Sequence, residues 1–357
     1  SHWVYDRDCQ PFIYKQFNSC AHRHEEFEKM YIGQGAILSL KPFFEELEMT
    51  GIPHEKVGIH PLTVICQEID RLYEEGKVGF DGVPYDQPQD GTIKTGSTCS
   101  GVGASRARKV LRDKNILLAK DVPELAKFIC DVSEEIIDRC NRGQSGLLEI
   151  CQGFQLSSGY KFYPNVTSRN ITVAAAFDDM FLPVSLLGNV VINLRTYPIR
   201  IASKKYICTK SGKHLTWEEV QSGHYEFEEK DSYSGDGYTD QTELDWDTLQ
   251  KENNLVIPQD VILTSLTKLP RRVFTFSKEN LRDSIVYNQT PNKIFLSLNF
   301  VNWIDGEMES KVDTTDISDK VYDWIDKFIK PITQKHQNVT LKWLGTGRYT
   351  EDTITLN

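Results

Sequence analysis

The stretch KIFLSLNFVNWI, residues 293–304, is an apolar run with many aromatic and β-branched residues, and it predicts a strand. A helix is predicted next over TTDISDKVYDWIDKFIKPI (314–332), and a last strand over VTLKWLG (339–345). This strand–helix–strand order predicts parallel strands with a helix on one face of their sheet. Because such sheets bind ligands at the carboxyl ends of their strands, polar residues at strand ends are candidates for a site.

The rest of the chain alternates between helical and strand patterns in the same way. Helices are expected over residues 41–52, 61–76, 104–113 and 121–143, and strands over 146–154 (buried) and 189–201. Residues 77–96 are typical of a long loop, and the polar residues 208–260 indicate either a linker or an active-site excursion. We therefore expect an α/β fold, a mainly parallel central sheet flanked by helices, in one domain over residues 1–357.

Composition argues against several classes of function. The formal net charge of -10 leaves no broad basic face for a nucleic-acid backbone. No apolar run is long enough to cross a bilayer, and the start, SHWVYDRDCQ, is charged and aromatic, unlike a signal peptide. The eight cysteines are scattered without a CxxC pair, which is typical of reduced thiols. We expect a cytoplasmic protein with no nucleic-acid or membrane partner.

Two stretches carry hydroxyl groups and amides that suit a ligand. In TGSTCSGVGASRARKVLR, Ser97 and Thr98 precede a basic helix, where backbone N–H groups and hydroxyls favour phosphate; a plain helix cap is the alternative. In EICQGFQLSSGYKFYPNVTSRNIT, Gln152 follows the expected buried strand, and Thr167 and Ser168 come later. These three side chains could bind one ligand between two loops. Alternatively, they could be a buried amide and ordinary turn hydroxyls.

A further stretch, TSLTKLPRRVF (264–274), concentrates hydroxyls and basic groups in an acidic chain. Arg271 and Arg272 could hold a carboxylate or phosphate through paired N–H groups. A surface salt-bridge cluster is the alternative.

Taken in chain order, these stretches resemble one family. GSTCSGVG…VLR, QGF…FYPNVTSRN, YPIRI and TSLTKLPRRVFTFS are similar to adenylosuccinate synthetases. IHPLTVI, SGDGYTDQTELDW, FLSLNFVNW and KWLGTGRYTED resemble the phage branch of that family, which acts on dGMP and serves 2-aminoadenine DNA. The resemblance covers nearly the whole chain, and it is specific collectively although no single motif is.

The resemblance implies a homodimeric, Mg²⁺-dependent ligase, located in the host cytoplasm if a phage encodes it. A nucleoside triphosphate phosphorylates O6 of a purine nucleotide, and the amine of L-aspartate then displaces that phosphate. The nucleotide monophosphate site implied by the resemblance comprises Ser97, Thr98, Gln152, Thr167, Ser168, Arg200 and, from across the dimer, Arg112. The aspartate site comprises Thr264, Ser265, Thr267, Arg271 and Arg272. The anion that TSLTKLPRRVF would hold is then the carboxylate of L-aspartate.

The sequence departs from the family pattern in its phosphate loop. The Gly-rich loop ending in Gly-Lys-Gly, which precedes the rest of the family's sequence and holds the γ-phosphate and Mg²⁺, has no counterpart here. SHWVYDRDCQPFIYK aligns with the segment that begins at the family's Gly-His-Thr motif, so His2 would be the catalytic histidine; a disordered terminal residue is the alternative. The chain is then expected to be an N-terminal truncation or a homologue that lost the loop. No metal ligand is identified.

The guanine-selecting Thr-Lys-Leu-Asp motif of cellular members is also replaced, here by SLNFVNW. Without the acidic group, ATP or dATP is expected as the phosphoryl donor in place of GTP. Triphosphate contacts are expected from Asn299 and Asn302, either of which could instead cap a strand end, and from Gly345 and Gly347.

Two hypotheses follow from these residues. The favoured one is a ligase joining L-aspartate to C6 of dGMP. The alternative is a nucleotide-binding pseudoenzyme or regulatory homologue without the phosphate loop. The residues do not decide between dGMP, IMP and GMP, and they do not identify the general base.

Overall fold

The computed structural model describes most of the chain, in two compact units. The described residues are 2–5, 10–87, 89, 97–213, 215–231, 234–264 and 268–356. Unit 1 comprises Ser1–Ile93 and Cys99–Leu187, and unit 2 comprises Lys94–Thr98 and Gly188–Asn357. The single domain expected over residues 1–357 stays a prediction. No helix among the described residues is long and apolar enough to span a membrane.

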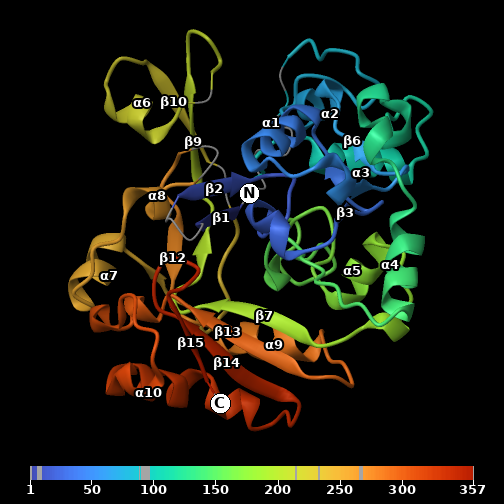
Figure 1. Ribbon diagram of the computed structural model, residues 1–357. Coiled ribbons are helices and arrows are strands. Elements are labelled where there is room, and N and C mark those ends of the chain that lie inside the picture. The colour runs from blue at the N-terminus through green and yellow to red at the C-terminus, as the bar shows by residue number, and fades with distance from the viewer. Residues whose placement is uncertain are drawn as a thin grey trace. The chain divides into compact units, whose positions relative to one another are not determined.

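A four-stranded sheet in unit 2 contains the predicted strand–helix–strand segment. Its strand order is β15, β14, β13, β7 (Figure 1), and the bounds are β7 Val190–Arg195, β13 Ile294–Asn299, β14 Val339–Gly345 and β15 Thr353–Thr355. Strand β13 runs parallel to β7 and β14, whereas β15 is antiparallel to β14. The predicted parallel sheet is confirmed, and β14 has the ends that the sequence predicted.

Three helices of unit 2 accompany this sheet in the chain: α9 (Lys278–Val286), α10 (Asp319–Phe328) and α11 (Lys330–Thr333). Helix α11 contacts both β14 and α9. Alternate residues of β13, namely Ile294, Leu296 and Leu298, are fully buried, as expected for a central strand. The helix predicted over 314–332 is confirmed in α10 and α11, although a 3-10 helix, Thr314–Asp316, precedes them.

Two predicted strands of unit 2 are shorter than expected. The strand over 293–304 ends at Asn299 because Phe300 has a left-handed backbone, after which a 3-10 helix spans Val301–Trp303. The strand over 189–201 divides into β7 and β8 (Ile199–Arg200), and Pro198, which lacks an N–H donor, lies between them. Strand β8 joins a second sheet in the order β11 (Glu243–Leu244), β12 (Arg272–Phe274), β8.

The polar excursion expected over 208–260 contains regular elements of its own. Strands β9 (Lys204–Cys208) and β10 (Phe227–Asp231) form an antiparallel hairpin. Helix α6 (Trp217–Gln221) lies in the connection between β9 and β10, and helices α7 (Trp246–Glu252) and α8 (Gln259–Ile262) come after β10. The hydroxyl of Thr216 and the carboxylate of Asp245 cap α6 and α7 by accepting hydrogen bonds from backbone N–H groups.

Unit 1 combines short strand pairs with helices around an aromatic core. Its strands are β1 (His2–Tyr5), β2 (Pro11–Tyr14), β3 (Met30–Ile32), β4 (Ile37–Leu38), β5 (Val57–Ile59) and β6 (Val64–Ile65). Strands β3 and β5 pair in parallel, as do β4 and β6, whereas β1 and β2 are antiparallel. The helices are α1 (Leu40–Thr50), α2 (Glu68–Glu74), α3 (Val102–Val110), α4 (Val132–Asn141) and α5 (Val173–Asp179). The rings of Phe17, Phe43 and Phe128 are almost fully buried in the core.

The predictions over 41–52 and 104–113 are confirmed by α1 and α3. Gly51 ends α1 with a left-handed backbone (φ 64°), a conformation that glycine adopts without strain. Residues 77–87 and 89, the described part of the predicted loop, contain no helix or strand.

Three predictions for unit 1 are wrong in part or in full. The helix over 61–76 begins only at Glu68, because Gln67 and Asp70 form a reciprocal capping box and β6 precedes them. The long helix over 121–143 breaks into a 3-10 helix, Pro123–Phe128, and α4, because Asp131 caps α4 by accepting from Glu134 N (2.9 Å). The buried strand over 146–154 is an exposed loop in which Leu147 is 79% exposed.

Candidate functional site

Three strand ends of unit 2 lie side by side at the carboxyl edge of the parallel sheet. Asn299 of β13 is in register with Arg195 of β7 on one side and with Gly345 of β14 on the other. A Cβ at Gly345 would lie 2.7 Å from Asn299 Oδ1, so glycine permits this close approach. Asn299 Nδ2 donates to Leu194 O (3.2 Å) and Ser297 O (3.3 Å), so the amide bonds to backbone carbonyls at the strand end, as the capping alternative expects. The triphosphate contacts of Asn299 and Gly345 stay predictions.

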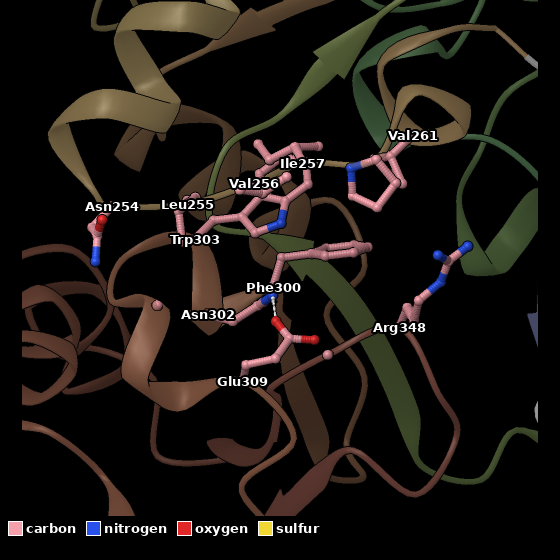
Figure 2. A pocket seen from close by; sticks show the side chains of 13 residues that line it. Asn254, Leu255, Val256, Ile257, Val261, Phe300, Asn302, Trp303, Glu309 and Arg348 are labelled. Carbon is pink, nitrogen blue, oxygen red and sulfur yellow. Dashed lines mark hydrogen bonds between the residues drawn. The ribbon is translucent and has the colours of Figure 1, made fainter.

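A cavity of about 270 Å³ adjoins the end of β13 (Figure 2). Phe300, Trp303 and the segment 254–258 form its largely apolar wall, and Asn302, Glu309 and Arg348 add polar groups. Small-molecule sites usually measure roughly 300–1,000 Å³. The cavity is therefore suited to one aromatic ring system rather than to a whole nucleotide.

The turn after β13 fixes the aromatic wall of this cavity. Phe300 has a left-handed backbone (φ 64°, ψ 43°), which is unfavourable for an aromatic residue. The fully buried Thr196 holds the turn, because its Oγ1 donates to Phe300 O (2.7 Å). The Phe300 ring lies 4.9 Å from that of Trp303, and the Trp303 ring also lies 5.9 Å from that of Trp246. The strained turn thereby presents two aromatic side chains in contact, with their ring planes tilted at 44° to one another.

The polar group nearest this wall is the amide of Asn302. Asn302 is 8% exposed, and its Nδ2 donates to Glu309 Oε2 at 2.5 Å, the dashed line in Figure 2. Since Nδ2 must face the carboxylate, Oδ1 is the remaining atom, and it has no hydrogen-bond partner among the described residues. Gly347 also lines the cavity, and a Cβ there would lie 2.3 Å from Asp352 Oδ2.

Arg195 is a guanidinium in an apolar setting. Its Cζ lies 4.2 Å from the centre of the Phe300 ring and 5.3 Å from that of Trp303. Its Nε and Nη2 are covered by protein and have no hydrogen-bond partner in the described part of the chain. Burial, together with the charge of Arg271, lowers the pKa of Arg195 to about 9. The side chain therefore stays protonated at pH 7, as a cation with no carboxylate partner among the described residues.

The two arginines proposed for aspartate have different surroundings. Arg271 Nη1 donates to Val261 O (2.7 Å), and burial lowers the pKa of Arg271 against the opposing effect of Asp260. Arg272 instead forms a bidentate pair with Glu243, at 2.8 and 2.6 Å, and its Nη1 donates to Gly235 O (2.8 Å). The salt-bridge alternative therefore describes Arg272 but not Arg271.

Other expected residues of unit 2 support their own loops. The buried Thr264 accepts through Oγ1 from Leu269 N (3.0 Å), whereas Ser265 and Thr267 lie outside the described residues. Arg200 is 7% exposed, and its Nη1 donates to Asp236 O. The carbonyl of Ser97 accepts from Lys205 Nζ (2.6 Å), and Thr98 is exposed.

The remaining nucleotide candidates lie on loops of unit 1. Gln152 is exposed and has a left-handed backbone (φ 78°), and Arg112 is exposed with φ 56°. Thr167 N donates to Leu156 O (2.8 Å), and Ser168 is exposed. His2 pairs through its backbone with Tyr14, while its side chain lies outside what the structure describes.

The N-terminus of α3, which the sequence offered for phosphate, already holds a carboxylate. The buried Glu74 accepts from Gly101 N (2.8 Å), Gly103 N (2.7 Å) and Ala104 N (3.2 Å). These N–H groups are the ones that a phosphate would use. The cap expected from the Ser/Thr turn is not what the structure shows: the N-cap residue is Gly101, which has no side-chain cap bond, and the carboxylate of Glu74 from α2 takes that place.

No group of three or more His, Cys, Asp or Glu among the described residues could hold a metal ion. Mg²⁺ therefore stays a prediction that rests on the resemblance.

Sequence reasoning missed Arg195, Trp303 and Glu309. Arg195 ends a strand, where arginine is common, and nothing in the sequence shows that it lacks a carboxylate. The aromatic residues Phe300 and Trp303 at the end of the predicted strand were a usable signal for an aromatic wall.

Comparisons with known proteins identify the family. No family model matches the chain. The N6-succino-2-amino-2'-deoxyadenylate synthase of Acinetobacter phage SH-Ab 15497 is 32% identical over 313 residues, which are 80% of this chain and 70% of that protein. The protein of that name from Vibrio phage phiVC8 is 29% identical over 286 residues, 78% of this chain and 68% of that protein.

A solved structure supports the fold independently. The succinoaminodeoxyadenylate synthetase of cyanophage S-2L, bound to dGMP and to dATP as an energy donor, has a TM-score of 0.71 and 23% identity, covering 99% of this chain and 83% of that chain. The adenylosuccinate synthetase of Pyrococcus horikoshii is 30% identical over 177 residues, 49% of this chain and 48% of that protein. The expected adenylosuccinate-synthetase-like fold is confirmed. The chain belongs to the adenylosuccinate synthetase family, with the phage N6-succino-2-amino-2'-deoxyadenylate synthases, and it is an enzyme of this C–N ligase type.

Proposed function

We propose that the chain joins L-aspartate to C6 of a purine nucleotide, with dGMP as the favoured acceptor and ATP or dATP as the donor. The γ-phosphoryl group passes to O6 of the base: the bond between Pγ and the β,γ-bridging oxygen breaks, the nucleoside diphosphate leaves, and N1 of the base loses its proton. The amine of aspartate then attacks C6, the C6–O bond breaks, phosphate leaves, and the nitrogen loses a proton. The product is a succinylated 2-aminoadenine deoxynucleotide.

The observation that carries this proposal is the aromatic-walled cavity at the carboxyl edge of the parallel sheet. Phe300 and Trp303 offer ring faces on which an adenine base can stack, at roughly 1–3 kcal/mol per base. Asn302 Oδ1 is an acceptor without a partner among the described residues, and the adenine amino group is a donor. Support for adenine also comes from the cyanophage S-2L relative, which is bound to dATP as an energy donor.

We assign the other substrates to the arginine, amide and hydroxyl groups that the resemblance implies. Arg271 and Thr264 hold aspartate, because Arg271 is the arginine of its loop that makes no hydrogen bond to a carboxylate of the described chain. Thr98, Gln152, Thr167 and, across a homodimer, Arg112 hold the phosphate and base of dGMP. The exposure of Gln152 and Arg112 leaves both side chains accessible to a ligand.

The proposal also includes Mg²⁺, which would neutralise charge on the transferred phosphoryl group. The described residues offer no cluster of three acidic, His or Cys ligands, so the ion would be held largely by the triphosphate. The chain's own part is to orient the donor base, to hold aspartate and to bind the nucleotide phosphate.

A turnover assay tests the proposal. The protein is mixed with dGMP, GMP or IMP, with L-aspartate and Mg²⁺, and with ATP, dATP or GTP, and the products are weighed by mass spectrometry. We expect a succinylated product from dGMP with ATP or dATP. Binding of dGMP without any product would support the pseudoenzyme alternative and overturn the ligase proposal.

A further inference from the structure

Two arginines that contact residues lining the cavity, Arg195 and Arg271, form no ion pair and no hydrogen bond with a carboxylate among the described residues. Arg195 lies against Phe300, and Arg271 donates to Val261 O, and both Phe300 and Val261 line the cavity. The nearby arginines are paired, Arg348 with Asp260 (2.8 Å) and Arg272 with Glu243 (2.6 Å). Among the described residues, each of these carboxylates is therefore already engaged.

We propose that Arg195 and Arg271 together bind one oxyanion of a substrate. The proposal rests on the proposed function and adds Arg195, a residue outside the TSLTKLPRRVF loop, to its binding groups. A guanidinium offers a planar fork of donors to a carboxylate or a phosphate, and Nε and Nη2 of Arg195 form one edge of that fork.

A structural role explains Arg195 poorly. A buried charge without a partner destabilises a fold, and a similarly sized apolar residue usually replaces it at no loss. The stack on Phe300 compensates only in part, because a ring face satisfies no N–H group. A cation retained in such a position is expected to gain its partner from a ligand, which also removes the repulsion between Arg195 and Arg271.

Two substrate groups have this chemistry, a carboxylate of L-aspartate and a phosphate of the donor. Both are oxyanions that accept paired N–H bonds. Arg271 belongs to the loop assigned to aspartate, whereas Phe300 belongs to the wall assigned to the donor base. The two arginines therefore lie where both substrates would meet.

The first test measures stability and does not depend on activity. Arg195→Met removes the charge and keeps much of the volume, and Arg195→Lys keeps the charge without the fork. Without anions, we expect Arg195→Met to raise the unfolding midpoint by about 2–4 °C. Added inorganic phosphate should raise the midpoint of the wild type and leave that of Arg195→Met unchanged. Arg282→Met is the control, since Arg282 is an exposed arginine of α9 paired with Asp283.

The second test uses steady-state kinetics to identify the oxyanion. We expect Arg195→Met to raise one KM by about tenfold or more, with Arg195→Lys in between and Arg282→Met unchanged. A rise confined to L-aspartate assigns the carboxylate, and a rise confined to ATP or dATP assigns a phosphate.

Failure of the inference is distinct from failure of the proposed function. A wild type that makes no succinylated product overturns the function, while the phosphate-dependent midpoint still decides the anion site. An Arg195→Met variant that is less stable without anions, and that gains the same midpoint shift from phosphate as the wild type, would overturn the inference.

Discussion

Helix α3 of unit 1 and the strand ends of unit 2 both carry clustered basic side chains, yet they differ in how these are paired. In α3, the buried Arg108 binds Asp70 (3.1 Å) and Asp113 (2.7 Å). Burial opposes its charge, but the hydrogen bonds to Asp113 and Asp70 prevail and raise the pKa of Arg108. Arg195 has no such partner among the described residues, and burial lowers its pKa.

The difference separates arginines that hold the fold from arginines that are available to a ligand. Arg106 of α3 is also paired with a carboxylate of unit 1, since its Nη2 lies 3.5 Å from Asp179 Oδ2. A basic stretch of sequence therefore says little about binding, and the positions of the carboxylates decide which cations remain unpaired.

The largest effect is expected from breaking the buried pair in α3. Arg108→Met leaves the carboxylate of Asp70, whose side chain is 0% exposed, without its cation, and should lower the free energy of unfolding by ~3–5 kcal/mol. Chemical denaturation measures this loss. Lys114→Met, an exposed cation in the following loop, is the control and should change it by less than ~0.5 kcal/mol. If Arg108→Met left the free energy of unfolding unchanged, Arg108 would not stabilise the fold, and its contrast with Arg195 would be wrong.

The next effect concerns the cap of α3. Glu74→Ala leaves three N–H groups at the start of the helix without their acceptor and should cost about 2 kcal/mol of unfolding free energy. Glu74→Gln, which keeps one acceptor oxygen, should lose less. Equal losses in the two variants, measured by denaturation, would show that packing rather than capping explains Glu74.

The sequence predicted elements well where local signals and tertiary contacts agree. Strand β14 has its predicted ends because its apolar run is short and Gly345 closes it. The prediction of one helix over 121–143 was wrong because the helical spacing of apolar residues continues across Asp131, although this side chain caps a new helix there. The prediction of a strand over 146–154 was wrong because an apolar run forms a strand only when another strand pairs with it.

The candidate site was predictable in part for the same reason. The strand-end positions of Asn299 and Gly345 follow from the parallel sheet, which the sequence indicated. The pairing of Arg272 with Glu243 joins residues that are distant in the chain, so no local pattern distinguishes Arg272 from Arg271. Arg195 was overlooked because the feature that marks it is an absent partner, which only the fold reveals.

The next prediction concerns the aromatic wall of the cavity in unit 2. Phe300→Ala removes the ring that lies against Arg195 and lines the cavity, so the KM for ATP or dATP should rise about tenfold, the equivalent of ~1.4 kcal/mol of stacking. Phe300→Tyr keeps the ring and is the control. A KM that rises for dGMP instead of the donor would assign the cavity to the acceptor nucleotide.

The smallest effect concerns a carboxylate of α4 in unit 1. Burial acts to raise the pKa of Glu135, but hydrogen bonds from Lys29 Nζ (2.8 Å) and Tyr31 Oη (2.8 Å) prevail and lower it. The folded protein therefore binds this proton less tightly than the unfolded chain does, so the contribution of Glu135 is complete above the unfolded pKa, about 4.3, and is lost as pH falls through the lower folded pKa.

Glu135→Gln should therefore lower the free energy of unfolding by less than ~1 kcal/mol at pH 7, since the pair is partly exposed. The difference from the wild type should shrink as pH falls from the unfolded pKa through the lower folded pKa of Glu135, since both proteins carry a neutral group at this position once that pKa is passed. Denaturation curves at pH 7 and at pH 3.5 measure it. A difference independent of pH would mean that the charge of Glu135 is irrelevant, and the pairing of charges inside unit 1 would then reflect packing rather than electrostatics.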